Sequence, residues 1–232
     1  MRLHRFVILA SLALTGHAGA DPVPDRLVVV ELFTSQGCSS CPPADALLAE
    51  LARTEPMVLP LGLHVTYWDR LGWRDPFALP AATARQRAYR ERFGLDAAYT
   101  PQAVVDGKRQ AVGSNREAVR AAIQHARMSA EAQPRLNLAA DGDGLRVQAG
   151  RSPGPGTLWL VGFDPHHATA VGAGENNGRT LHDANVVRTL VRAAGTTGAP
   201  VDLRLPRPAG ARVAALLQAE EDGRILAAAL LP

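Results

Sequence analysis

The stretch of sequence that decides the fold is Leu27-Val28-Val29-Val30-Glu31-Leu32-Phe33-Thr34-Ser35-Gln36-Gly37-Cys38-Ser39-Ser40-Cys41-Pro42-Pro43. Its first seven residues form a β-branched apolar run, which predicts a strand buried on both faces. After the prolines, apolar residues recur at helical spacing, which predicts a helix. A second apolar run, 57–65, predicts the next strand. A β-α-β unit therefore brackets the two cysteines.

Three more elements follow before residue 131. Residues 83–93 are rich in Ala, Arg and Gln and predict a helix. In 99–112, two short strands flank Asp106-Gly107, a strong hairpin signal. Ser114 and Glu117 then predict a capping box for a helix that ends near residue 130.

The residue pattern of the chain changes at Pro134. From there, short apolar segments alternate with Gly- and Asp-rich turns, which predicts a β-sandwich of roughly 100 residues. We therefore expect an α/β domain over 21–133 and a small all-β, sandwich-like domain over 134–232. The predicted strands of the second domain are 135–140, 145–149, 157–163, 201–205, 213–218 and 225–230.

Residues 1–20 predict a secretory signal peptide. A basic start precedes an apolar run over 6–14, and Ala18-Gly19-Ala20 matches the small-residue cleavage pattern. The apolar run is too short for a transmembrane helix, so we expect no stable membrane span after cleavage near Ala20. The protein is therefore predicted to be periplasmic or secreted, in an oxidising compartment.

Charge and composition exclude some classes of function. The chain carries a formal net charge of +3, and two of its arginines lie in the predicted signal peptide. The remaining arginines are scattered and Lys108 is the single lysine, whereas nucleic-acid binding needs a concentrated basic surface. We expect no nucleic-acid partner and no cofactor.

The chain has only two cysteines, Cys38 and Cys41. A disulfide closing a four-residue loop stabilises by only about 2 kcal/mol, against about 4.7 kcal/mol for a 100-residue loop. A pair this close is better suited to thiol exchange than to holding the fold together. Its place between a buried strand and a helix indicates redox chemistry, with Cys38 as nucleophile and Cys41 as resolving thiol. A static disulfide or half of a metal site are the alternatives.

Pro42 and Pro43 directly follow the cysteines. Because proline favours the first helical position, the helix is expected to begin at Pro42, with both cysteines in the preceding turn.

The N-terminal half resembles the thioredoxin-like superfamily, through the dithiol motif and through Tyr99-Thr100-Pro101 before a hairpin. The resemblance implies that Pro101 is cis and faces the dithiol, and that Thr100 contacts substrate. The implied substrate is a protein or a small thiol or disulfide, and the redox partner is unknown.

The whole mature chain resembles domain-of-unknown-function family 1223 of secreted bacterial proteins. The resemblance covers both predicted domains and implies no specific biochemistry. Its motifs lie in 31–45, 64–77, 99–107, 174–182 and 185–188.

Three further residues are candidates for the site. Glu31 interrupts the buried strand and is either a proton acceptor for Cys41 or the partner of an arginine such as Arg85. His64 and Trp68 begin an aromatic-rich segment at the end of a predicted strand, where ligand crevices form in open α/β sheets. Both are candidates to bind substrate; core packing is the alternative.

The sequence therefore predicts a thiol-disulfide oxidoreductase with no bound metal. A copper-binding module or metallochaperone is one alternative, with both cysteines and His64 as Cu(I) ligands. A non-catalytic protein that binds an envelope partner is the other.

Overall fold

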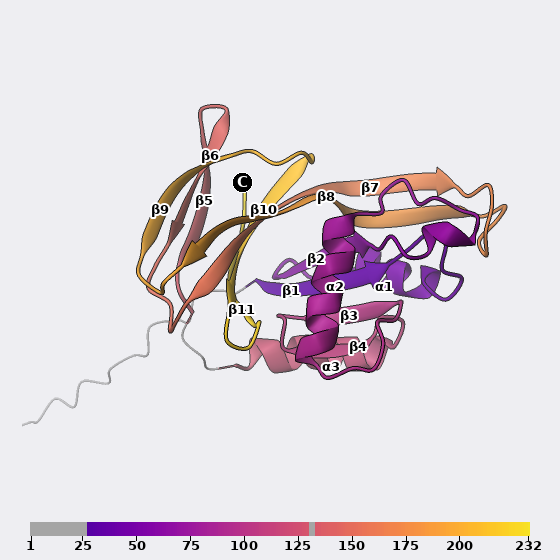
Figure 1. Cartoon of the computed structure of the whole chain (residues 1–232), viewed down its shortest axis with the longest axis horizontal. Coiled ribbons are helices and arrows are strands. Elements are labelled where there is room, and N and C mark those ends of the chain that lie inside the picture. Colours follow the sequence, from indigo (N-terminus) through magenta and orange to yellow (C-terminus); the bar gives the residue numbers. More distant parts are fainter. Residues whose placement is uncertain (1–26, 130–132) are drawn as a thin grey trace, which may run out of the picture.

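A computed structural model describes residues 27–129 and 133–232 (Figure 1). The predicted signal peptide lies outside these residues. Strands make up 42% of the structure and helices 20%. No helix in the described residues is long and apolar enough to cross a membrane.

The elements follow one another along the chain as three helices, a short 3-10 helix and eleven strands within the described residues. In order they are β1 (Val28–Thr34), α1 (Pro42–Thr54), β2 (Val58–His64), η1 (Asp69–Leu71), α2 (Pro80–Arg92), β3 (Gln102–Val105), β4 (Arg109–Val112), α3 (Arg116–Arg127), β5 (Leu136–Asp141), β6 (Gly144–Ala149), β7 (Gly156–Ala170), β8 (Thr180–Thr196), β9 (Val201–Pro206), β10 (Arg212–Ala219) and β11 (Ile225–Leu230).

The β-α-β unit around the cysteines is confirmed. β1 and β2 are parallel neighbours, and every residue of both strands is buried, as the apolar runs predict. The hairpin β3–β4 is also present, with Asp106 at φ 49° and Gly107 at φ 67° in its turn. The helix after it is capped by Asn115, whose side chain accepts the amide of Ala118, so the predicted capping residue Ser114 was wrong by one position.

The strands form one large mixed sheet and one small sheet. The large sheet has eight strands in the order β11-β10-β7-β8-β2-β1-β3-β4, and the small one has three in the order β5-β6-β9. Figure 1 shows the long β7–β8 hairpin running from the small sheet to the opposite end of the molecule.

The predicted fold class, a thioredoxin-like α/β domain followed by a separate β-sandwich, is wrong. Strands from both sides of residue 133 join in the eight-stranded sheet, because β7 continues seven residues beyond its predicted end and is followed by β8, which the sequence did not predict. The division of the chain into folding units near residue 133 stays a prediction.

A close approach of two strands joins the two parts of the large sheet. β2 and β8 run parallel, with Gly62 opposite Val186. A Cβ on Gly62 would lie 3.2 Å from the carbonyl oxygen of Ala184, so glycine allows this approach. Beside it, Asn185 adopts φ 46° and its Nδ2 donates to the carbonyl of Pro60 at 2.8 Å.

One hydrophobic core crosses the joint. It combines side chains of β1 and β2 with side chains of β7, β8, β10 and β11, and helix α2 covers it. Phe33 and Leu61 from the first half and Phe163 and Leu216 from the second are each at most 1% exposed. The dithiol loop is therefore attached to a core to which both halves of the chain contribute.

Candidate functional site

Cys38 and Cys41 form a disulfide in the turn between β1 and α1. The helix begins at Pro42, as predicted, and Cys41 is the residue before it. The amide of Cys38 donates to the carbonyl of Ser35 at 3.1 Å, and that of Cys41 to the carbonyl of Cys38 at 3.2 Å. These turn hydrogen bonds occupy the two cysteine amides. Both cysteines are 0% exposed.

Thr100 lies beside the disulfide, and Trp68 contacts Thr100. The hydroxyl of Thr100 donates to Sγ of Cys38 at 3.3 Å, and Nε1 of Trp68 donates to the same hydroxyl at 2.8 Å. The Thr100-Pro101 peptide bond is cis, which confirms what the resemblance implies. The hydroxyl of Ser40 lies 3.4 Å from the same sulfur. Three separate segments therefore meet at Cys38.

His64 is buried in the interior, only 1% exposed. Its Nδ1 lies 2.7 Å from Oδ2 of Asp75, and its ring meets that of Phe77 edge-on. Burial lowers the pKa of His64, but the charge and hydrogen bond of Asp75 more than offset this and raise the pKa to about 9. His64 is therefore a satisfied interior residue in this structure, and its predicted contact with substrate stays a prediction.

Glu31 is also buried, and its carboxylate is held by Arg85 and Tyr89. Both carboxylate oxygens accept from the Arg85 guanidinium, and the Tyr89 hydroxyl donates at 2.6 Å. Burial alone lowers the pKa of Arg85, but the carboxylate of Glu31 more than offsets this and raises the pKa. The arginine partnership is confirmed, while the catalytic role of Glu31 stays a prediction.

Asp45 is a buried carboxyl group that the sequence analysis missed. It lies on α1 four residues after Cys41, and residues at this spacing share one face of a helix. The Thr34 hydroxyl donates to its Oδ1 at 2.7 Å. Burial, followed by the nearby charge of Asp183, raises the pKa of Asp45 to about 7. The i+4 spacing from Cys41 was the available sequence signal.

Gln36, in the dithiol loop, contacts two of the interior carboxylates, Asp75 and Asp183. Its amide nitrogen donates to Oδ2 of Asp75 at 2.8 Å, and its side-chain Nε2 donates to Oδ2 of Asp183 at 2.7 Å. Asp183 lies on β8, so both halves of the chain supply carboxylates behind the dithiol loop. No group of three or more His, Cys, Asp or Glu side chains in the described residues has the geometry to hold a metal ion.

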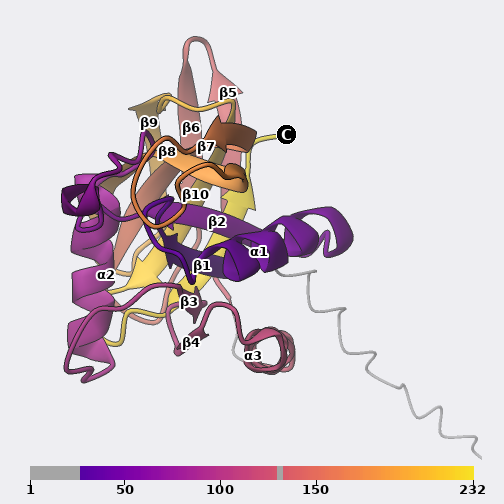
Figure 2. The same ribbon diagram turned by 90° about the vertical axis from the view of Figure 1, so that its right-hand side faces the viewer.

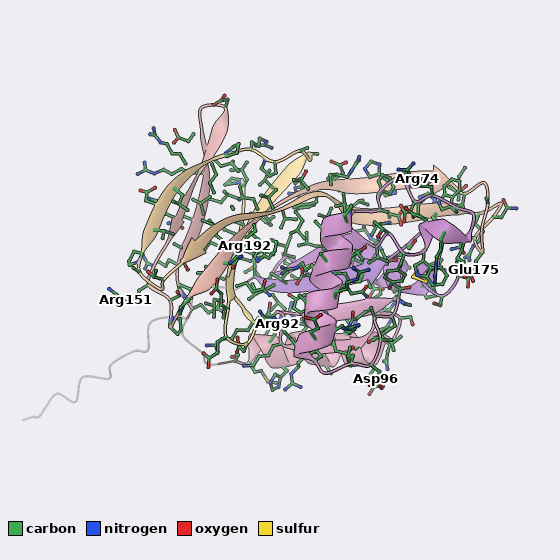
Figure 3. The ribbon with its side chains drawn as sticks, viewed as in Figure 1. Arg74, Arg92, Asp96, Arg151, Glu175 and Arg192 are labelled. Atoms are coloured by element: carbon green, nitrogen blue, oxygen red, sulfur yellow. A yellow bond between two sulfur atoms is a disulfide. The ribbon has the colours of Figure 1, made fainter. Side chains whose placement is uncertain are left out.

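The segment after β7 also reaches the dithiol loop. Nδ2 of Asn176 donates to the carbonyls of Gln36 and Cys38, at 2.9 and 3.0 Å. The Glu175 carboxylate accepts the amide of Ser39 at 3.0 Å. Figure 3 shows the yellow disulfide at the end of the molecule where Glu175 is labelled.

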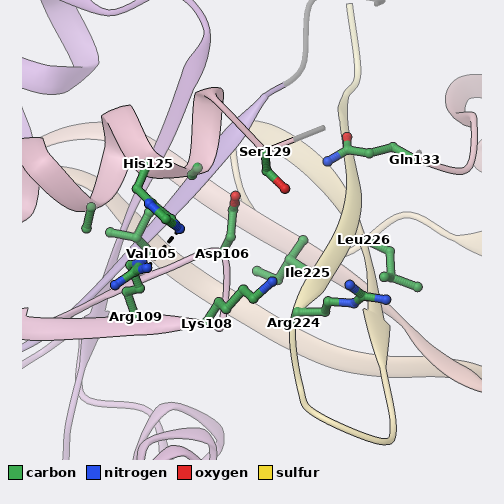
Figure 4. A pocket seen from close by; sticks show the side chains of 12 residues that line it. Val105, Asp106, Lys108, Arg109, His125, Ser129, Gln133, Arg224, Ile225 and Leu226 are labelled. Atoms are coloured by element: carbon green, nitrogen blue, oxygen red, sulfur yellow. Dashed lines mark hydrogen bonds between the residues drawn. The ribbon is translucent and has the colours of Figure 1, made fainter. Parts of the chain in front are cut away.

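Hollows elsewhere on the described part of the chain include the following two. One, of about 580 Å³, lies between α2 and strands β7 and β10 and is lined by Arg85 and Trp159 among others. The other, of about 50 Å³, lies beside the β3–β4 turn; in it Arg109 donates to His125 at 2.8 Å (Figure 4). No predicted site residue lines either hollow.

Two solved structures resemble this one. A protein from Agrobacterium tumefaciens, known from its X-ray crystal structure, is 28% identical; the match covers 89% of this chain and 94% of that one, with a TM-score of 0.76. HBP35 of Porphyromonas gingivalis is 15% identical with a TM-score of 0.54, and the match covers 88% of this chain and 74% of that one. The second likeness concerns the fold alone.

A search of curated proteins gave no significant match. The profile of a family described as "protein of unknown function (DUF1223)" matches residues 29–218, most of the chain. The chain therefore belongs to the DUF1223 family.

Proposed function

We propose that this protein is a periplasmic or secreted thiol-disulfide oxidoreductase, with Cys38 as the exchanging sulfur and Cys41 as the resolving one. The observation that carries the proposal is the hydrogen bond from the Thr100 hydroxyl to Sγ of Cys38. A donor at this position stabilises a thiolate, the form of cysteine that exchanges. The meeting of a strand–dithiol–helix unit with Thr100-Pro101 supports a redox site of the thioredoxin-like type.

The exchange proceeds in two steps whose electrons balance. The Cys38 thiolate attacks a substrate disulfide, forms a mixed disulfide and releases one substrate thiolate. The Cys41 thiolate then attacks Sγ of Cys38, and the second substrate thiolate leaves. The substrate has gained two electrons, and the protein returns to the disulfide form. The reverse steps oxidise a substrate dithiol, and the potential of the partner decides the direction.

The second step requires Cys41 to lose its proton. Asp45 is the candidate to accept it, because it lies in the first turn of α1, four residues after the capping residue Cys41, whose carbonyl accepts the Asp45 amide at 3.1 Å. Its pKa of about 7 suits proton exchange near neutral pH. Glu31, for which the sequence offered both the acceptor role and pairing with an arginine, is held by Arg85. Matched variants Glu31→Gln and Asp45→Asn separate the two roles, because only loss of the acceptor slows the resolving step.

Trapping of the mixed disulfide tests the proposal directly. Cys41→Ser is incubated with insulin as disulfide substrate, and Cys38→Ser serves as the matched control. We expect Cys41→Ser to accumulate a covalent adduct that dithiothreitol releases, and Cys38→Ser to accumulate none. Equal adduct in both variants, or none in either, contradicts the assignment of Cys38 as the exchanging sulfur.

A further inference from the structure

The loop between β7 and β8, residues 171–179, holds the dithiol loop from one side; we call it the strap. It lies at the far tip of the long hairpin, coloured orange in Figure 1, and Figure 2 views this end of the molecule directly. Gly174 and Gly178 have φ of 72° and 78°, which lets the chain reverse on either side of Glu175-Asn176-Asn177.

The strap binds backbone groups on both sides of Cys38. Asn176 is 0% exposed, and its carboxamide donates to the carbonyls of Gln36 and Cys38. The carboxylate of Glu175 accepts the amide of Ser39. The position of Asn176 is in turn fixed by Arg179, whose Nη1 donates to Oδ1 of Asn176 at 2.9 Å. The strap therefore satisfies two carbonyls and one amide of the dithiol loop.

These contacts match the chemistry of a polypeptide backbone. The carboxamide N–H of Asn176 donates to carbonyls as a peptide amide does, and the carboxylate of Glu175 accepts an amide as a peptide carbonyl does. An extended chain beside the dithiol loop would satisfy the same three groups in the manner of an added strand. A thiol without peptide groups, such as 2-mercaptoethanol, has too few donors and acceptors to replace all three.

The sulfurs are accessible only after a local opening of the structure around them. Both cysteines are 0% exposed, while Trp68 and Thr100 hold the other side of Cys38. A reductant therefore reacts only with a locally open state, and its rate is scaled by the population of that state.

We propose that the strap is a gate over the dithiol, that Asn176 is the positioning residue that keeps it closed, and that the substrate is a polypeptide whose backbone takes the place of the strap. The inference deepens the proposed function and rests on it for the substrate. The gate itself is tested on the protein's own disulfide, without turnover of any substrate.

The gate is measured by the rate at which tris(hydroxypropyl)phosphine reduces the disulfide in the full chain. Asn176→Ala removes both hydrogen bonds from this side chain to the dithiol loop, worth about 1 kcal/mol each, which predicts reduction roughly thirtyfold faster. Asn177→Ala, the exposed neighbour in the same turn, is the control and should stay within about twofold of wild type. Equal rates for the two variants overturn the gate.

Urea separates a local gate from general loss of stability. A locally opening strap exposes little surface, so the logarithm of the reduction rate should rise with urea much less steeply than global unfolding requires. A slope equal to the full equilibrium m-value overturns the gate even if Asn176→Ala reacts fast. Glu175→Ala, which removes only the contact to Ser39, should accelerate reduction severalfold.

The substrate class is tested separately. Wild-type protein in the disulfide form is mixed with 2-mercaptoethanol or with an eight-residue peptide containing one cysteine, at equal thiolate concentration. We expect the peptide to form the mixed disulfide at least tenfold faster. Equal rates overturn the polypeptide substrate but leave thiol exchange intact, whereas no adduct with either thiol contradicts the proposed function itself.

Discussion

Replacing Arg85 by methionine tests whether the pair Glu31–Arg85 is a structural unit of the core. In the folded protein Arg85 donates to both oxygens of Glu31, to the Tyr89 hydroxyl and to Oε1 of Gln218. Arg85→Met leaves the Glu31 carboxylate, 1% exposed, without its counter-ion. Breaking a buried pair in this way costs about 3–5 kcal/mol.

The cost is measured by urea unfolding followed by far-UV circular dichroism, and independently by thermal unfolding. For a chain of this size, 3–5 kcal/mol corresponds to a fall in Tm of about 6–20 °C. The double variant Glu31→Leu with Arg85→Met removes both charges and is expected to recover most of the loss, because apolar residues of similar volume replace buried pairs at little cost. Tyr89 then still accepts from Nε2 of Gln218.

Two results would refute this reasoning. A cost of less than about 1 kcal/mol for Arg85→Met would show that water or rearrangement already compensates Glu31. A double variant as unstable as the sum of the two single variants would show that the two residues contribute independently, without the energetic coupling expected of a buried pair.

Three further predictions concern other parts of the molecule. Because the pKa of Asp45 is raised from 3.8 to about 7, the folded protein holds this proton more tightly than the unfolded chain, and stability falls as pH rises through that range; Asp45→Asn should flatten the fall in urea titrations at several pH values. Gly162→Ala places a Cβ 1.9 Å from the carbonyl oxygen of Ala209 and should lower the free energy of unfolding by about 1–3 kcal/mol, whereas an unchanged urea midpoint would contradict the close approach. Asn115→Ala removes the cap of α3 and should cost about 1 kcal/mol, seen as a fall in Tm of about 2–4 °C, while Ser114→Ala should leave Tm unchanged.

The first half of the fold was predictable because its signals are local. The apolar run before Cys38 contains enough β-branched residues to indicate a buried strand, and Asp106-Gly107 supplies the positive φ values that its hairpin turn needs. The start of α1 at Pro42 followed from the preference of proline for the first helical turn.

The large sheet was not predictable by the same reasoning. The residues of β8 lack a regular apolar alternation, because successive parts of this strand pair with β7 and β2 and meet different surroundings. Asn185, within this strand, has a positive φ, and asparagine with this conformation is typical of turns, not of strands. Because β8 was not predicted, no predicted strand linked β2 of the first half to β7 of the second half in one sheet. The predicted fold class was therefore wrong.

The site, like the fold, was predictable only in part. Thr100 and Pro101 were predicted from the thioredoxin-like resemblance and Trp68 from the aromatic-rich segment at a strand end, and the structure brings Thr100 to Cys38 and Trp68 to Thr100. Asn176 lies in the family motif 174–182 but was not predicted as a site residue, because it is 138 residues from Cys38 in the chain and only the course of the β7–β8 hairpin brings it to the dithiol loop.

The joint between β2 and β8 has a consequence for the way the protein is made. During synthesis β2 emerges more than a hundred residues before β8, the neighbour that covers its open side. Until then, β2 is an apolar edge with unpaired backbone groups, a template for pairing between chains. We expect a fragment ending at residue 129 to aggregate, whereas the full chain covers this edge with β8.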